Sequence, residues 1–116
     1  MFKDILEGLL KRVDGSLAAF LAGSDGLIVE QCCREGHDGL DLEQLAADCT
    51  QIIRNGSGVL DDLAEVALSG TNQRLILRLL AGSYFVVLII CGSAMAGRVR
   101  YELLKLQSSL EAEIAG

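Results

Sequence analysis

The sequence contains no proline, although 13 of its 116 residues are glycine. Chain reversals must therefore be built mainly on glycine, and no linker is stiffened by a proline ring. About half of the residues are apolar (51%), which is typical of a packed globular chain and argues against intrinsic disorder. A chain of this length is expected to form a single domain over residues 1–116.

The sequence also lacks a long apolar run. The longest run covers residues 84–91, far short of the roughly 20 residues that a membrane helix requires. Residues 1–13 mix charged and apolar side chains, unlike a secretory signal. The net charge of −6 disfavours nucleic acid and anionic lipid, because both repel an acidic surface. We therefore expect no nucleic-acid partner and no membrane insertion.

Motifs that carry chemistry are missing as well. The pattern G-x-x-x-x-G-K-[ST] of a P-loop GTPase is absent. His37 is the only histidine and lies beside Glu35 in a polar loop, where a solvated side chain is a better interpretation than a metal ligand. Asp61, Asp62 and Glu65 are clustered without a histidine, which favours a solvated acidic face over an acid–base pair. We expect no catalytic residues, no metal, no cofactor and no enzymatic activity.

The four cysteines are Cys32, Cys33, Cys49 and Cys91, and no two of them have the C-x-x-C spacing of a metal or redox site. Cys49 and Cys91 lie in apolar stretches, where a free thiol behaves as a small hydrophobic side chain. This usage is typical of the reducing cytoplasm, which is the predicted location. A redox switch between the adjacent Cys32 and Cys33 remains an alternative.

Hydrophobic periodicity predicts eight elements. Residues 23–26 (Gly-Ser-Asp-Gly) lie between two strands and open no helix, so they are predicted to form a hairpin turn and not a phosphate loop. Asp41 is the predicted N-cap of the middle helix, and Gly92-Ser93 offers one to the last helix. The predicted order is a helix at 2–13, strands at 16–22 and 27–32, a helix at 41–63, strands at 65–69, 73–80 and 84–91, and a helix that ends at 116.

Apolarity sorts the five predicted strands. Those at 16–22 and 84–91 are apolar on both faces and should be central, whereas those at 27–32 and 65–69 alternate and should lie at the edges. Hairpin connections then leave the sheet order 2-1-5-4-3. With helices on both faces, the prediction is an α/β three-layer sandwich with a mainly antiparallel five-stranded sheet and the topology αββαβββα.

The helix predicted at 41–63 carries an apolar stripe that spans about 140° of its circumference. The stripe is wide enough to pack on the sheet and on a second helix, although the sheet alone could fill it. Gly56 and Gly58 would each cost about 1 kcal/mol in a helix interior, so either something packs closely there or the helix breaks around 55–58. The stripe comprises Leu42, Leu45, Ala46, Cys49, Ile52, Ile53, Gly56, Val59, Leu60 and Leu63.

The whole chain resembles a roadblock (dynein light chain) domain, and within that family the bacterial branch that regulates a gliding-motility GTPase. The resemblance lies in SLAAFLAGSDGLIVE (16–30), in the long amphipathic helix, in the hairpin that closes on Gly82-Ser83-Tyr84, and in Gly97-Arg98-Val99-Arg100-Tyr101 at the start of the last helix. The order of the elements is the stronger part of the resemblance. Longin and profilin-like domains share much of that order.

The resemblance implies a dimer formed through the middle helix and strand 65–69, either with a second copy or with a paralogous roadblock-like subunit. A lone edge strand is a pairing liability that a twofold partner would remove, which agrees with this expectation. The implied dimer interface comprises Leu45, Cys49, Ile52, Ile53, Gly56, Val66, Ala67 and Leu68. The family also scaffolds or regulates Ras-like small GTPases, and Gln51, Arg54 and Asn55 on the polar face of the helix are candidate contacts.

Two functions of different class follow. The first is a non-catalytic, dimeric regulator or scaffold that binds a Ras-like small GTPase and stimulates its hydrolysis of GTP or only holds it. The alternative is a small-molecule sensor or orphan enzyme on a longin/profilin-like sandwich, which would require a sizeable pocket with convergent polar groups. The polar residues of this chain fall in turns and on helix faces, so the sequence favours the first.

Overall fold

The computed structural model describes residues 1–92, 94 and 96–116. The helix cap predicted at Gly92-Ser93 falls on Ser93, which lies outside the described residues. The elements are α1 (Phe2–Arg12), β1 (Ser16–Gly23), β2 (Ile28–Cys33), α2 (Leu42–Val59), β3 (Glu65–Ser69), β4 (Gln73–Leu80), β5 (Tyr84–Cys91) and α3 (Ala96–Ala115).

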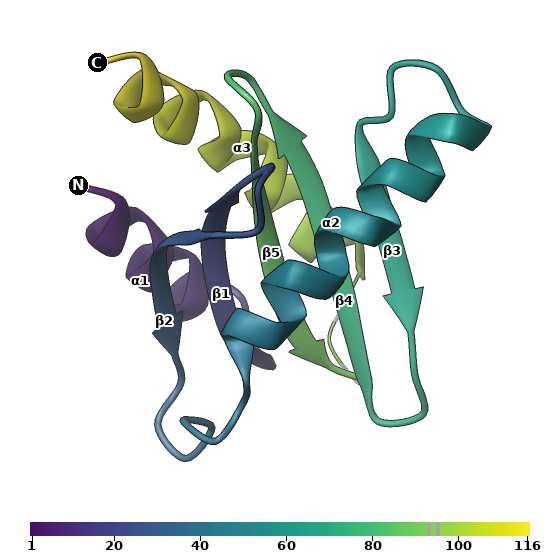
Figure 1. Ribbon diagram of the computed structural model, residues 1–116. Helices are drawn as coiled ribbons and strands as arrows, with labels where there is room; N and C mark the ends of the chain where they lie inside the picture. The colour runs from purple at the N-terminus through teal and green to yellow at the C-terminus, as the bar shows by residue number, and fades with distance from the viewer. Residues whose placement is uncertain (93, 95) are drawn as a thin grey trace.

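The strands form one sheet in the order β2-β1-β5-β4-β3, and each neighbouring pair is antiparallel (Figure 1). The predicted topology and strand order are therefore confirmed. β1 and β5 are central and almost wholly buried, as their apolar character on both faces predicted. β2 lies one residue further along the chain than predicted, whereas β4 and β5 have the predicted bounds.

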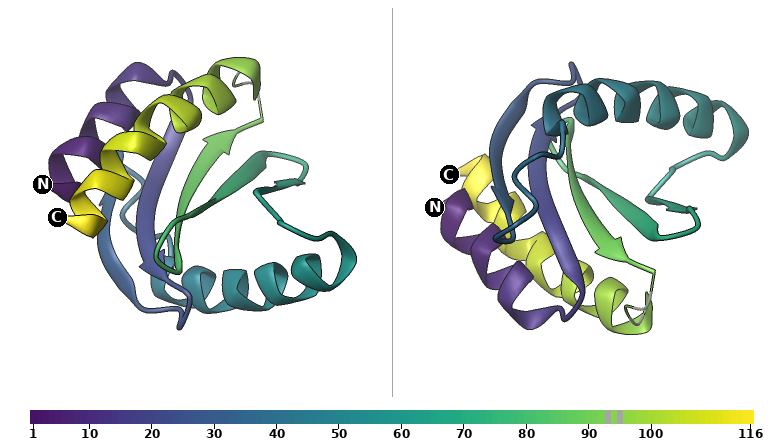
Figure 2. Two further views of the ribbon diagram at one scale, coloured as in Figure 1. Left: turned by 90° about the horizontal axis from the view of Figure 1, so that it is seen from above. Right: turned by 90° about the horizontal axis from the view of Figure 1, so that it is seen from below.

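The two faces of the sheet are covered unequally (Figures 1 and 2). α1 and α3 lie side by side on one face, here called the two-helix face, and α2 lies alone on the other, the one-helix face. Each face has its own hydrophobic core because the central strands bury alternate residues on opposite sides. On the one-helix face Phe20 and Phe85 pack edge to face, with ring centroids 6.2 Å apart.

Arginines tie the two-helix face together. Arg34, which follows β2, donates to the backbone carbonyl of Leu10 in the last turn of α1, where the negative end of the helix dipole favours a cation. It also donates to the carbonyl of Ser16 at the start of β1. Glu102 of α3 is only 2% exposed and pairs with Arg12 of α1 at 2.9 Å and with Arg98 at 3.4 Å. The buried carboxylate thus joins the two helices that share this face.

α2 begins where predicted. The Asp41 carboxylate accepts a hydrogen bond of 3.1 Å from the backbone N–H of Gln44, so it caps the first turn. The helix continues through Gly56 and Gly58. The alternative of a break around residues 55–58 is therefore wrong.

The predicted end of the middle helix at residue 63 is also wrong, because α2 ends at Val59. The chain leaves the helical path at Leu60, which is extended with φ −126° and ψ 131°, although the apolar spacing continues. Asp62 follows in the left-handed conformation with φ 54° and turns the chain. Leu63 then folds back onto the helix: a Cβ atom built at Gly56 would lie 2.9 Å from Leu63 Cδ2. The close neighbour of Gly56 is therefore a side chain of this chain, Leu63, and not a second helix.

None of the helices in the described ranges, 1–92, 94 and 96–116, has the length and apolar character needed to span a bilayer.

Candidate functional site

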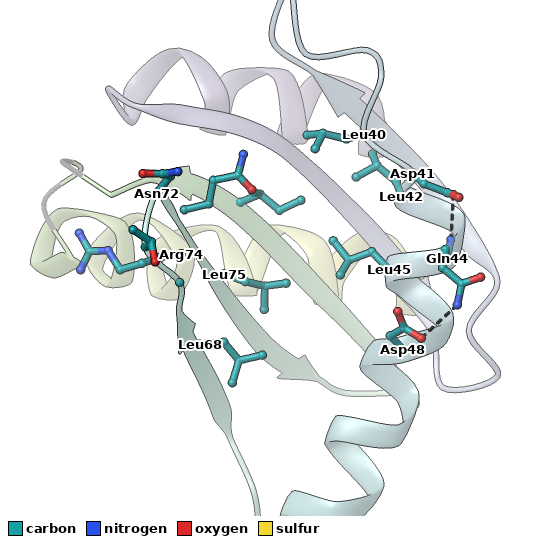
Figure 3. A pocket seen from close by; sticks show the side chains of 14 residues that line it. Leu40, Asp41, Leu42, Gln44, Leu45, Asp48, Leu68, Asn72, Arg74 and Leu75 are labelled. Atoms are coloured by element: carbon teal, nitrogen blue, oxygen red, sulfur yellow. Dashed lines mark hydrogen bonds between the residues drawn. The ribbon is translucent and has the colours of Figure 1, made fainter.

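An open groove runs between the first half of α2 and the strands β3 and β4 (Figure 3). Its volume is about 690 Å³. Leu45 and Leu42 point into it from α2, and Leu68 and Leu75 approach it from the sheet. The apolar residues that line it are Leu40, Leu42, Leu45, Leu68, Leu75 and Ile89. The one-helix face thus keeps an apolar surface that α2 does not cover.

The polar groups on the α2 side of this groove are bonded along the helix. Asp41 caps the helix at Gln44, and Gln44 Nε2 donates to Asp48 Oδ1 at 3.0 Å, so these groups are satisfied along α2 (Figure 3). The guanidinium of Arg74 points away from the groove and donates to the carbonyls before α3. A pocket for a small polar ligand needs convergent free polar groups. This groove is better suited to the apolar surface of a macromolecule.

The sheet alone does not cover the apolar stripe of α2. Only Leu42, Ala46 and Cys49 of α2 are buried. Past them the helix runs out beyond β3, at the edge of the sheet (Figures 1 and 2). At its end Val59 is 80% and the following Leu60 61% exposed. Burying such large apolar side chains against a partner would be favourable.

β3 forms an open edge beside this groove. The N–H of Leu79 donates to the carbonyl of Ala64 at 3.0 Å, and the N–H of Gly70 donates to that of Gln73 at 2.8 Å. Hydrogen-bonded pairs alternate along an antiparallel ladder, so every second residue between these pairs directs its N–H and C=O away from β4. The residues with outward backbone groups are Glu65, Ala67 and Ser69. They present unpaired donors and acceptors to a further strand.

The structure brings some of the predicted interface residues to one surface. Leu45 lines the groove, and Ala67 and Leu68 are exposed on β3. Val66 packs against the core of the one-helix face. Cys49 is completely buried, so its side chain cannot contact a partner. The remaining predicted residues are half-buried along α2: Ile52, Ile53 and Gly56.

Sequence reasoning left Val59 and Leu60 out of the interface, although both are large, apolar and exposed. The predicted helix continued to residue 63, and Val59 and Leu60 were assigned only to its apolar stripe. The signal in the sequence was the apolar pair followed directly by the acidic Asp61 and Asp62.

The three candidate contacts for a GTPase lie together on α2. Gln51, Arg54 and Asn55 are all exposed, and they occupy neighbouring turns because residues three and four apart share a helix face. They lie beside the half-buried Ile52 and Ile53. Polar and apolar side chains are thus interleaved on the outer surface of the same helix.

The buried thiols are poor nucleophiles. Burial raises the pKa of Cys49 to about 11, and burial likewise raises the pKa of Cys32 to about 11. The pKa of Cys33 is also raised by burial. Cys32 packs into the core of the two-helix face and Cys33 against that of the other face, because neighbouring strand residues point to opposite sides. This geometry disfavours a disulfide switch between them.

Within the described part of the chain, no group of three or more His, Cys, Asp or Glu side chains could hold a metal ion. His37 lies half-buried in the loop between β2 and α2.

No model of a protein family matches the chain, and no curated protein sequence matches it. Solved structures are similar to it. A Roadblock/LC7 domain from Streptomyces avermitilis shares 18% identity over 98% of both chains, with a TM-score of 0.84. The gliding protein MglB from Thermus thermophilus shares 16% identity over 94% of this chain and 84% of its own, with a TM-score of 0.86. MglC from Myxococcus xanthus shares 26% identity over 95% and 96%, with a TM-score of 0.72. The chain therefore has the roadblock/LC7 fold.

Proposed function

We propose that this chain is a non-catalytic, cytoplasmic, dimeric regulator or scaffold that binds a Ras-like small GTPase. The observation that carries the proposal is the position of an apolar groove next to an open sheet edge. The similar solved structures include the gliding protein MglB and MglC, which is consistent with a regulatory role.

In the proposed dimer two copies pair through β3, antiparallel about a twofold axis near Ala67. The outward N–H and C=O of Ala67 in each copy then find partners, and the two sheets continue into one. The α2 helices run antiparallel beside each other. The exposed end of α2 reaches the groove of the second copy. There Val59 and Leu60 contact Leu45 and Leu68.

The same pairing brings the outer surfaces of both α2 helices together. Gln51, Arg54 and Asn55 then appear twice on one surface, and this doubled surface is the proposed contact for the GTPase. A paralogous roadblock-like subunit would replace the second copy in a heterodimer. Stimulation of GTP hydrolysis is a separate part of the proposal and has its own measurement.

Proline at Ala67 tests the dimer. Ala67→Pro removes an N–H that faces away from β4, so the ladder within the chain is kept while pairing with a second β3 is blocked. We expect sedimentation to give a dimer for the unaltered chain at micromolar concentration and a monomer for Ala67→Pro. Gln31→Pro, an equivalent change in the other edge strand, is the control and should remain dimeric. A monomeric unaltered chain, or a dimeric Ala67→Pro, would contradict the proposed dimer.

Arg54→Ala tests the GTPase contact. A Ras-like GTPase from the same genome, loaded with GDP or with a non-hydrolysable GTP analogue, should bind the unaltered chain in one nucleotide state and bind Arg54→Ala at least about tenfold more weakly, as for a lost charge-assisted contact. Lys11→Ala, which removes an exposed positive charge from α1, is the control. If neither nucleotide form binds, the GTPase is not the partner. Phosphate release measured with the same proteins separates stimulation of hydrolysis from scaffolding.

A further inference from the structure

The second edge of the sheet, β2, is closed by side chains of the same chain. The backbone N–H of Gln31 donates to Glu30 Oε1 at 3.1 Å, and Lys3 Nζ of α1 donates to the carbonyl of Gln31 at 3.0 Å. Lys3 and Glu30 also form an ion pair of 3.9 Å. The N–H of Arg34 bonds to the carbonyl of Leu17 in β1, so the alternation along β2 directs the Gln31 backbone outward. Both of its outward groups are therefore occupied.

A bulge adds to this protection. Leu21 pairs with Glu30 and Ala22 pairs with Ile28, so Val29 between them has no partner in β1. Bulges of this kind increase the local twist and are one of the means by which proteins protect edge strands. The edge is nevertheless apolar, because Val29 is 46% and Leu27 70% exposed. Without its protection, this strand would attract another.

β3 has no comparable protection. Its one charged residue, Glu65, is turned toward the two-helix face and bonds to Arg78 at 3.5 Å and Arg100 at 2.9 Å. Across the described ranges, no side chain bonds to the outward backbone groups of Ala67. The chain therefore blocks one edge of its sheet and leaves the other open.

We propose that β2 is a second pairing edge for another copy of this chain and that Lys3 and Glu30 keep it closed. The occupant of the opened edge is the β2 strand of a second copy, antiparallel about Gln31, because the outward N–H and C=O of one residue on a twofold axis satisfy those of its symmetry mate. A chain that pairs at both β3 and β2 has two partners per copy and therefore assembles beyond a dimer. Lys3 and Glu30 thus set the size of the assembly.

Removing the two side chains should not unfold the protein. The side chains of Lys3 and Glu30 are 50% and 34% exposed, and ion pairs of this kind contribute little to stability. Their role is to occupy the backbone of Gln31, and a change in assembly is therefore separable from a change in folding.

The test is the double variant Lys3→Ala/Glu30→Ala, compared with Lys11→Ala/Glu35→Ala, which removes one exposed charge of each sign from α1 and from the loop after β2. Light scattering after size exclusion should give a mass at least about double that of the unaltered chain for the first variant and an unchanged mass for the second. Far-ultraviolet circular dichroism should be the same for both. An unchanged mass for Lys3→Ala/Glu30→Ala would overturn the proposal.

Two further variants identify the edge that is used. Gln31→Pro added to the double variant removes the outward N–H and should restore the original mass. If the mass stays raised when Gln31→Pro is present, another surface is involved, and this result would overturn the proposal. In the Ala67→Pro background the double variant should reach a dimer and no further. This last comparison does not depend on pairing through β3, so failure of the proposed dimer and failure of the β2 proposal are distinguishable.

Discussion

The two faces of the sheet use polar side chains differently. On the two-helix face they reach between elements: Arg12 of α1 pairs with Glu102 of α3 at 2.9 Å, and Arg78 Nε of β4 donates to Gln107 Oε1 of α3 at 2.8 Å. Around the groove of the one-helix face, the side-chain bond of 3.0 Å from Gln44 to Asp48 joins successive turns of α2. Polar side chains that bond from one element to another hold the helices of a layer together. Polar side chains that bond along one helix leave the apolar surface of that helix free to contact a partner.

The two long helices show the same contrast. α2 and α3 carry similar apolar spacing in the sequence. On α3, Val99, Leu103, Leu106 and Leu110 are all buried, because α1 lies beside α3 and covers the same face. α2 lies alone, and its stripe is buried only in its first half. An apolar stripe thus becomes core or interface according to its neighbours.

The largest effect is expected on the two-helix face. Leu103 is completely buried between α1, α3 and the sheet, so Leu103→Ala should lower the free energy of unfolding by about 2–5 kcal/mol. Urea denaturation measures this loss. Leu104→Ala is the control, because the adjacent side chain is exposed and its removal should change stability by about 0.5 kcal/mol or less.

The same denaturation experiment on Leu45→Ala tests the contrast between the faces. Leu45 is only half-buried and lines the groove, so we expect a loss of stability clearly smaller than for Leu103→Ala in the monomeric Ala67→Pro background. An equal loss would show that the one-helix face is as well packed as the two-helix face.

A smaller effect is expected at the start of α2. Asp41→Ala removes the carboxylate that accepts the N–H of Gln44 and should lower the free energy of unfolding by about 1 kcal/mol, the usual value of a lost N-cap. Asp38→Ala, in the exposed loop before the helix, removes the same charge without a cap and serves as the control. If the two variants are equally stable, the cap does not support α2.

Local patterns were sufficient to predict most of the fold. The bounds of β4 and β5 and the sheet order follow from alternation and short hairpins, which depend on neighbouring residues. The end of α2 was predicted incorrectly because the apolar spacing continues to Leu63, while the chain leaves the helix at Leu60 and turns at Asp62. Periodicity cannot distinguish a helix that continues from a leucine that folds back onto Gly56.

The surfaces were less predictable for a related reason. The bond from Lys3 to the Gln31 carbonyl joins residues 28 positions apart, and the groove joins α2 to β3 and β4. The sequence indicated the open edge through the alternation of Val66 and Leu68. It gave no sign that the other edge is closed, since that depends on where α1 packs.

The smallest effect concerns two thiols beneath opposite faces. Cys49 belongs to α2 and lies in the core of the one-helix face, and Cys32 lies in the core of the two-helix face. The pKa of each is raised by burial to about 11. The thiolate is the reactive form, so the alkylation of both thiols should accelerate about tenfold per pH unit below that pKa.

In the Ala67→Pro monomer α2 loses its proposed partner and opens more readily. We therefore expect Cys49 to be alkylated several-fold faster than in the unaltered chain, and Cys32 at the same rate. Peptide-resolved mass spectrometry of iodoacetamide labelling measures both in one sample. Equal acceleration of the two thiols would indicate general destabilisation, and no acceleration of Cys49 would indicate that no partner covers α2.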